Sequence, residues 1–77
     1  MNKQRRESLS KLSGQLDDIK SEVETLRDEE QEAFDNMPEG LQNGERGEKS
    51  QTAISALDEA ISSIEEAIGK IEEATEE

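Results

Sequence analysis

The C-terminal half of this chain repeats one seven-residue unit three times, as AISALDE at 53–59, AISSIEE at 60–66 and AIGKIEE at 67–73. Each unit holds Ala and Ile, two variable residues, Leu or Ile, and two acidic residues. Apolar residues that recur at spacings of three and four lie on one face of an α-helix. The repeat therefore predicts an amphipathic helix over about 45–75, whose apolar face has to be covered by other helices.

The apolar face of this helix is wider than the seam of a two-stranded coiled coil. With Ile54 at heptad position a, the g positions from 53 to 74 all hold alanine, where dimeric coiled coils usually carry charge. The width favours a further helix that approaches closely on that side. A simpler interpretation is that alanine is used only because it is the best helix former. The expected oligomer interface comprises Ala53, Ile54, Leu57, Ala60, Ile61, Ile64, Ala67, Ile68, Ile71 and Ala74.

The N-terminal half carries a second apolar pattern with the same spacing, which predicts a helix over about 4–36. The helix should end before Pro38, because proline lacks an amide hydrogen and pushes the preceding residue out of helical geometry. Continued with the same spacing, the pattern places Glu30 at the next apolar position, so an acidic residue interrupts the apolar stripe. The stripe itself consists of Leu9, Leu12, Leu16, Ile19, Val23 and Leu26.

Two long helices joined by a loop over about 37–44 predict an antiparallel helical hairpin. The second helix is expected to start near Gly44 or Glu45, with Asn43 or Ser50 as its capping residue. In each predicted layer of the hairpin, an a position of one helix meets a d position of the other. The predicted layers pair Leu16 with Ile71, Ile19 with Ile68, Val23 with Ile64, and Leu26 with Ile61.

The length of 77 residues corresponds to one small domain, 1–77, at a size where a single chain rarely buries enough apolar surface to be stable alone. Cys and His are both absent from the sequence, so neither a disulfide nor a typical zinc site is available to stabilise it. We therefore expect an all-α fold in which antiparallel hairpins assemble into a homodimeric four-helix bundle or a higher symmetric oligomer.

The net charge of −12 limits the partners of this chain. A net positive charge is found only in residues 1–11, while most of the surface would repel a phosphate backbone or an anionic membrane. We therefore expect no direct DNA or RNA binding and no membrane association. The segment MNKQRRESLSKLS lacks the apolar stretch of a signal peptide, so a cytoplasmic location is expected.

Catalysis has little support in the residue types. With no His, Cys or Tyr, acid–base and nucleophilic chemistry would fall to carboxylates, Lys and hydroxyls. Glu72, Glu73 and Glu76 have the spacing of the first acidic motif of magnesium-dependent helical nucleotide pyrophosphohydrolases, but no second motif follows them. A solvated acidic face explains these residues better. We expect no enzymatic activity, no metal and no cofactor.

The most varied part of the chain is FDNMPEGLQNGERG at 34–47. One interpretation is structural: apolar residues plug the end of the bundle and the others turn the chain. The other is a nucleotide site, in which amide hydrogens and basic side chains hold phosphate while apolar and amide side chains contact a base. The candidate ligand-binding residues are Phe34, Asn36, Met37, Gln42, Asn43, Arg46 and Lys49.

The run DNMPEGLQ at 35–42 with ERGE at 45–48, between a basic start and a heptad tail, resembles a family of small uncharacterised helical proteins encoded in phages and prophages. Such proteins are similar in size and class to phage anti-defence proteins that sequester nucleotide immune signals. The resemblance implies a protein of the bacterial host cell that binds a cyclic nucleotide or an ADP-ribose derivative at a subunit interface without cleaving it.

Two alternatives remain open at the level of the sequence. The acidic surface could bind a host protein, as an adaptor or as a mimic of nucleic acid, and such binding should weaken steeply as salt rises. The chain could also be a purely structural helical oligomer. In each of these functions the chain first associates with copies of itself.

Overall fold

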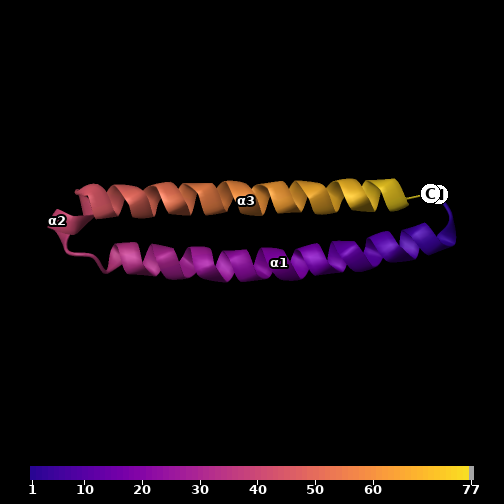
Figure 1. The fold of residues 1–77 in the computed structure, drawn as a ribbon, viewed down its shortest axis with the longest axis horizontal. Helices are drawn as coiled ribbons and strands as arrows, with labels where there is room; N and C mark the ends of the chain where they lie inside the picture. The colour runs from indigo at the N-terminus through magenta and orange to yellow at the C-terminus, as the bar shows by residue number, and fades with distance from the viewer. Residues whose placement is uncertain (77) are drawn as a thin grey trace.

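The computed structural model describes residues 1–76, and all of the regular secondary structure in this range is helical (Figure 1). The long helices are α1 (Lys3–Asp35) and α3 (Glu45–Thr75), and one short helix, α2 (Glu39–Gln42), lies between them. The all-α prediction is confirmed. α1 and α3 run side by side in opposite directions, so the two termini lie at one end of the molecule and α2 lies at the other.

Local hydrogen bonds explain where α1 begins and ends. The Asn2 side chain accepts a hydrogen bond from the Arg5 amide at 2.8 Å, which satisfies one of the free N–H groups of the first turn. At the other end, the amides of Asn36 and Met37 donate to carbonyls of the last turn, and Pro38 follows. The helix ends there because proline has no amide hydrogen with which to continue the ladder.

The connection between the long helices is more ordered than a loop over 37–44, because α2 forms one helical turn inside it. The Gln42 amide group donates at 2.9 Å to the Phe34 carbonyl, which also accepts from the Met37 amide, so α2 is tied to the last turn of α1. The prediction that Asn43 or Ser50 caps the second helix is wrong. The capping residue is Gly44, which makes no side-chain hydrogen bond, and the Ser50 hydroxyl instead donates to Glu30 across the helix pair.

The first turns of α3 pack directly on the backbone of α2. Gly47 is buried, and a Cβ atom at this position would overlap the Gln42 carbonyl. Only glycine permits so close an approach of two backbones. Gly47 therefore fixes how the chain reverses between α2 and α3.

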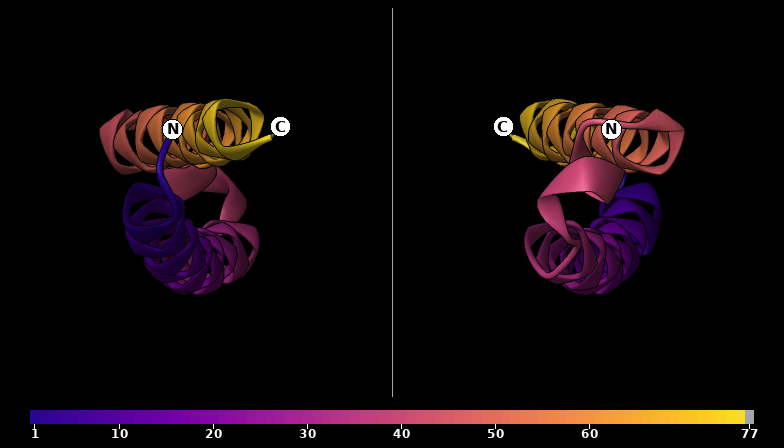
Figure 2. Two further views of the ribbon diagram at one scale, coloured as in Figure 1. Left: turned by 90° about the vertical axis from the view of Figure 1, so that its right-hand side faces the viewer. Right: turned by 90° about the vertical axis from the view of Figure 1, so that its left-hand side faces the viewer.

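The helix pair is elongated, with extents of 58 × 14 × 13 Å. Its radius of gyration is 17.4 Å, whereas a compact domain of this length has a radius of gyration of about 11–12 Å. Views along the axis show two helices side by side, with only the short α2 beside them at one end (Figure 2). Along most of their length, α1 and α3 are therefore covered by each other alone.

α3 turns its a and d positions toward α1, as the heptad pattern predicts. Ile54 is 7% exposed, and the following residues of the stripe are half-buried. Ile54 is also the only apolar side chain classed as buried within residues 1–76. The half-buried residues of the stripe are Leu57, Ile61, Ile64, Ile68 and Ile71.

The face that α1 turns toward α3 differs from the predicted one. Its a positions are half-buried as expected, but Leu12, Ile19 and Leu26 at the d positions are 48%, 47% and 60% exposed. The prediction that these three side chains fill the interface with α3 is wrong. The half-buried positions next to them are Ser13, Lys20 and Arg27, at heptad position e.

The rotation of α1 brings Lys20 and Arg27 within reach of acidic side chains of α3 and leaves apolar side chains outside. The predicted pairings of Ile19 with Ile68 and of Leu26 with Ile61 fail because this rotation turns both α1 residues outward.

Candidate functional site

The helix pair has two long flanks of opposite character. A helix advances about 100° per residue. When α3 turns positions a and d inward and an antiparallel α1 turns positions a and e inward, the d positions of α1 and the g positions of α3 fall on the same side. We call this side the apolar flank; it consists of Leu12, Ile19, Leu26, Ala33, Ala53, Ala60, Ala67 and Ala74. The opposite side, the polar flank, contains Lys20, Arg27, Asp58 and Glu65.

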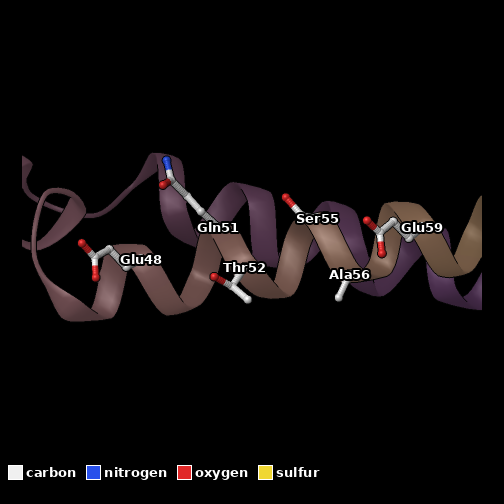
Figure 3. A pocket seen from close by; sticks show the side chains of 6 residues that line it. All are labelled: Glu48, Gln51, Thr52, Ser55, Ala56 and Glu59. Carbon is white, nitrogen blue, oxygen red and sulfur yellow. The ribbon is translucent and has the colours of Figure 1, made fainter.

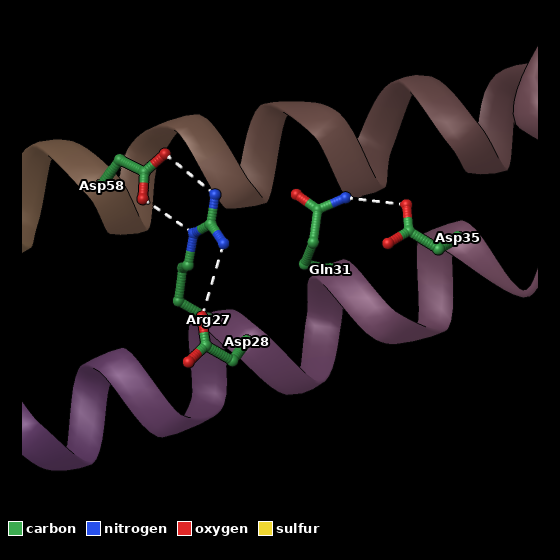
Figure 4. A network of polar contacts seen from close by, with 5 residues as sticks. All are labelled: Arg27, Asp28, Gln31, Asp35 and Asp58. Carbon is green, nitrogen blue, oxygen red and sulfur yellow. Dashed lines mark hydrogen bonds and ion pairs between the residues drawn. The ribbon is translucent and has the colours of Figure 1, made fainter.

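The polar flank is held by ion pairs between the helices (Figure 4). Arg27 Nε donates to Asp58 Oδ1 at 2.8 Å, and Arg27 Nη1 lies 3.4 Å from Asp28 Oδ1. Lys20 Nζ lies 3.7 Å from Glu65 Oε1. The hydrogen bond to Asp58 raises the pKa of Arg27 above its ordinary value. Exposed pairs of this kind contribute little stability.

The apolar flank has no comparable partner within the chain. Leu12, Ile19 and Leu26 are among the most exposed large apolar side chains, and three of the four alanines opposite them are exposed. The edge of α3 beside these alanines carries no acid within residues 1–76, although the chain is strongly acidic. The g and c positions that form this edge are Arg46, Lys49, Ala53, Ala56, Ala60, Ser63, Ala67, Lys70 and Ala74.

An open cavity of about 290 Å³ lies on the apolar flank near α2 and is lined by Glu30, Met37, Arg46, Lys49, Ser50 and Ala53. It brings together three of the predicted ligand-binding residues, Met37, Arg46 and Lys49. At its base the hydroxyl of Ser50, which is 5% exposed, donates to Glu30 Oε2 at 2.5 Å. Lys49 pairs with Glu45 at 3.3 Å, while Arg46 makes no hydrogen bond or ion pair with the described residues.

The other four predicted ligand-binding residues do not line this cavity. Phe34 lines a separate cavity of about 320 Å³ together with Gln51 and Ile54. Gln42 directs its amide group at carbonyls of α1, and Asn36 and Asn43 are exposed. The seven residues are therefore spread over several surfaces, and only those of the 290 Å³ cavity share a site.

A further hollow of about 580 Å³ runs along the outer surface of α3 (Figure 3). All six of its residues come from this one helix: Glu48, Gln51, Thr52, Ser55, Ala56 and Glu59. A single convex helix cannot enclose a ligand, and the carboxylates of Glu48 and Glu59 would repel an anion. This surface is not a candidate site.

The sequence contained a signal for the rotation of α1. Lys20 and Arg27 are seven residues apart, as are Asp58 and Glu65 on α3, and the two pairs meet in opposite order. The matched spacing indicates a ladder of ion pairs between antiparallel helices. Glu30, which interrupts the apolar stripe, has a similar explanation in its hydrogen bond with Ser50.

No group of three or more acidic, His or Cys residues within positions 1–76 is arranged to hold a metal ion. Neither long helix, over the same residues, contains an apolar stretch of the length that a bilayer crossing requires. Comparison of the chain with protein-family models, with curated proteins and with solved structures returns no match. The apolar flank and the cavity near α2 are thus the features from which a function is inferred.

Proposed function

We propose that this chain is a self-associating helical module that forms a homodimeric four-helix bundle through its apolar flank and acts by binding. The observation that carries the proposal is the exposure of Leu12, Ile19 and Leu26, while Ile54 is the one buried apolar side chain within residues 1–76. A second copy would cover these residues and give the bundle the core that one helix pair lacks.

The exposed surface area of the chain supports the same proposal. Folded monomers of 8.6 kDa expose about 4,700 Å², whereas this chain exposes 5683 Å². The excess of about 1,000 Å² matches the area that each partner buries in an interface of standard size, about 600–1,000 Å². The elongated flank offers that area without any change in fold.

Sedimentation equilibrium and native mass spectrometry test the self-association. We expect twice the 8.6 kDa chain mass at micromolar concentration. Leu26→Glu places a charge on the apolar flank and should weaken dimerisation at least 100-fold, because an unpaired charge would be buried. The matched control is Ser21→Glu, an exposed position away from the flank, which should leave the dimer intact. A wild-type monomer at 100 μM, or equal effects of the two variants, would contradict the proposal.

A second candidate function is sequestration of a nucleotide immune signal, without cleavage, at the cavity near α2. It is supported by the convergence of Met37, Arg46 and Lys49 on one cavity. The two basic side chains supply charge for phosphate, and the thioether of Met37 supplies an apolar contact for a base.

Titration calorimetry against cyclic nucleotides and ADP-ribose derivatives tests this second function. We expect binding by the wild type and at least a tenfold loss in Arg46→Ala, with Lys11→Ala, an exposed basic residue distant from the cavity, as the control. No heat with any of these ligands would exclude it. Binding of a host protein that weakens steeply with salt and persists in Arg46→Ala would point instead to the acidic outer surface.

A further inference from the structure

The ion pairs of the polar flank also define which residues of the apolar flank lie at the same height along the pair. Arg27 contacts Asp58 and Lys20 contacts Glu65, so the two residues of each pair lie at similar heights, within the reach of these long side chains. Moving one residue toward the N-terminus on α1 and two residues toward the C-terminus on α3 leads in the same direction, with a remaining offset of about 1.5 Å. Leu26 therefore lies near Ala60 in height, and Ile19 lies near Ala67.

The seven-residue spacing extends this match along the flank. Leu12 is level with Ala74, and Ala33 is level with Ala53. The flank thus consists of two parallel rows of equal pitch. The row on α1 is bulky over three of its four positions, and the row on α3 is made of alanine throughout.

We infer that the proposed dimer has its two-fold axis along the length of the bundle, so that α1 of each chain packs on α3 of the partner and both α2 helices lie at the same end. This inference rests on the proposed self-association and specifies its geometry. A rotation about the long axis preserves height, so Leu26 meets the partner's Ala60 and Ile19 meets the partner's Ala67. Each bulky side chain is then opposite a small one, which is the arrangement that fills a helix interface without voids.

The alternative symmetric arrangement has its axis across the bundle and places the two α2 helices at opposite ends. In that dimer α1 would face the partner's α1, and α3 would face the partner's α3. Bulky residues would oppose bulky residues along one seam, while alanines would oppose alanines along the other. One seam would be crowded and the other would contain voids, so the two seams could not reach good packing at a common spacing.

The charges that border the apolar flank favour the same arrangement. On α1 the adjoining g positions include Glu22 and Glu29, whereas the adjoining c positions of α3 include Lys49 and Lys70. An axis along the bundle sets the edge of α1 beside the partner's edge of α3, with Glu22 about 9 Å along the axis from the partner's Lys70 and Glu29 about 12 Å from the partner's Lys49. An axis across the bundle would place edges of like charge together, which raises the electrostatic energy of the dimer.

The inferred geometry makes the cavity near α2 a shared site. Ala33 of one chain is level with the partner's Ala53, which lines the partner's cavity, so the end of α1 would cover the open side of that cavity. Both cavities, each with an Arg46 and a Lys49, would lie at one end of the dimer. Four basic side chains would then gather in one region of an otherwise acidic molecule.

Distance measurement between spin labels tests the geometry. The chain has no cysteine, so Asn43→Cys provides a single labelling site at the α2 end. The inferred dimer predicts a separation below about 35 Å, because neighbouring helices pack 8–10 Å apart and the labels add their own length. The alternative dimer predicts a separation near the 58 Å length of the pair. A label at Thr75→Cys, at the other end, should repeat the short distance.

Disulfide trapping gives an independent test. When a Leu26→Cys chain is mixed with an Ala60→Cys chain, the inferred dimer predicts rapid cross-linking between the two different chains, because bridged Cβ atoms must lie within about 4.5 Å. Predominant Leu26→Cys homodimers, or long label distances in a confirmed dimer, would overturn the geometry while leaving self-association standing. A monomer in sedimentation equilibrium would contradict both the inferred geometry and the proposed self-association.

Discussion

The two flanks of the helix pair use neighbouring positions of α1, but one flank is paired within the chain and the other is left exposed. The polar flank is satisfied within the chain, because Lys20 and Arg27 pair with acids of α3. The apolar flank, one residue away along the same helix, leaves Ile19 and Leu26 exposed. A helix that packs against a single neighbouring helix can bury only one side of its surface. The difference indicates that the charged side is satisfied within the chain, whereas the apolar side is left for association.

The sharpest comparison of the flanks is between adjacent residues, Leu26 and Arg27. We expect Leu26→Ala to lower the free energy of unfolding of the dimer by about 2–4 kcal/mol per site, through lost burial and an unfilled space. Arg27→Ala should have a much smaller effect, because its ion pair with Asp58 is exposed to solvent. Urea unfolding at several protein concentrations measures both. If the two variants lose equal stability, the flanks are equivalent and the comparison fails.

The next largest effect concerns the end where both flanks meet α2. Gly47→Ala should destabilise the fold by about 2 kcal/mol, because the new methyl group would displace the α2 backbone. Gly69→Ala, with no atom within 4 Å of the new Cβ, should instead stabilise α3 by about 0.5–1 kcal/mol. Thermal unfolding followed by circular dichroism compares them. A neutral Gly47→Ala variant would show that α2 does not hold the two helices in place.

The smallest effect is expected for Ser50→Ala, beneath the cavity on the apolar flank. Loss of its hydroxyl leaves the half-buried Glu30 carboxylate without its donor and should reduce stability by about 1 kcal/mol. The double variant Ser50→Ala with Glu30→Leu should regain that stability, because both polar groups are then removed. Chemical unfolding of the three proteins checks this. A double variant less stable than the single one would mean that Glu30 has another favourable role.

The sequence predicted the inward face of α3 but not that of α1, for a physical reason. On α3 the residues from Ile54 to Ile71 repeat without interruption, so one face is clearly the most apolar. On α1 the apolar stripe competes with Lys20 and Arg27, whose pairing with Asp58 and Glu65 depends on the other helix. The apolar pattern of α1 taken alone does not show that its charged residues will pair with acidic residues of another helix.

The candidate site was predictable only in part. Met37, Arg46 and Lys49 do gather around one cavity, because they lie near the chain reversal and on the same flank. Gln42 does not join them, since its amide group donates to the carbonyls of Phe34 and Asp35 at the end of α1. Phe34 lies at a position of α1 that the rotation turns toward the other flank. Hydrogen bonds of this kind depend on the folded turn, which residue types alone do not describe.

The 58 Å rod shape has a consequence for how the molecule moves in water. A rod experiences more friction than a sphere of equal mass, so a single chain would elute from a sizing column ahead of globular standards of 8.6 kDa. Joining two rods side by side doubles the mass but adds only thickness. Diffusion would therefore slow only modestly on pairing, and an elution volume alone would be a poor guide to the number of chains.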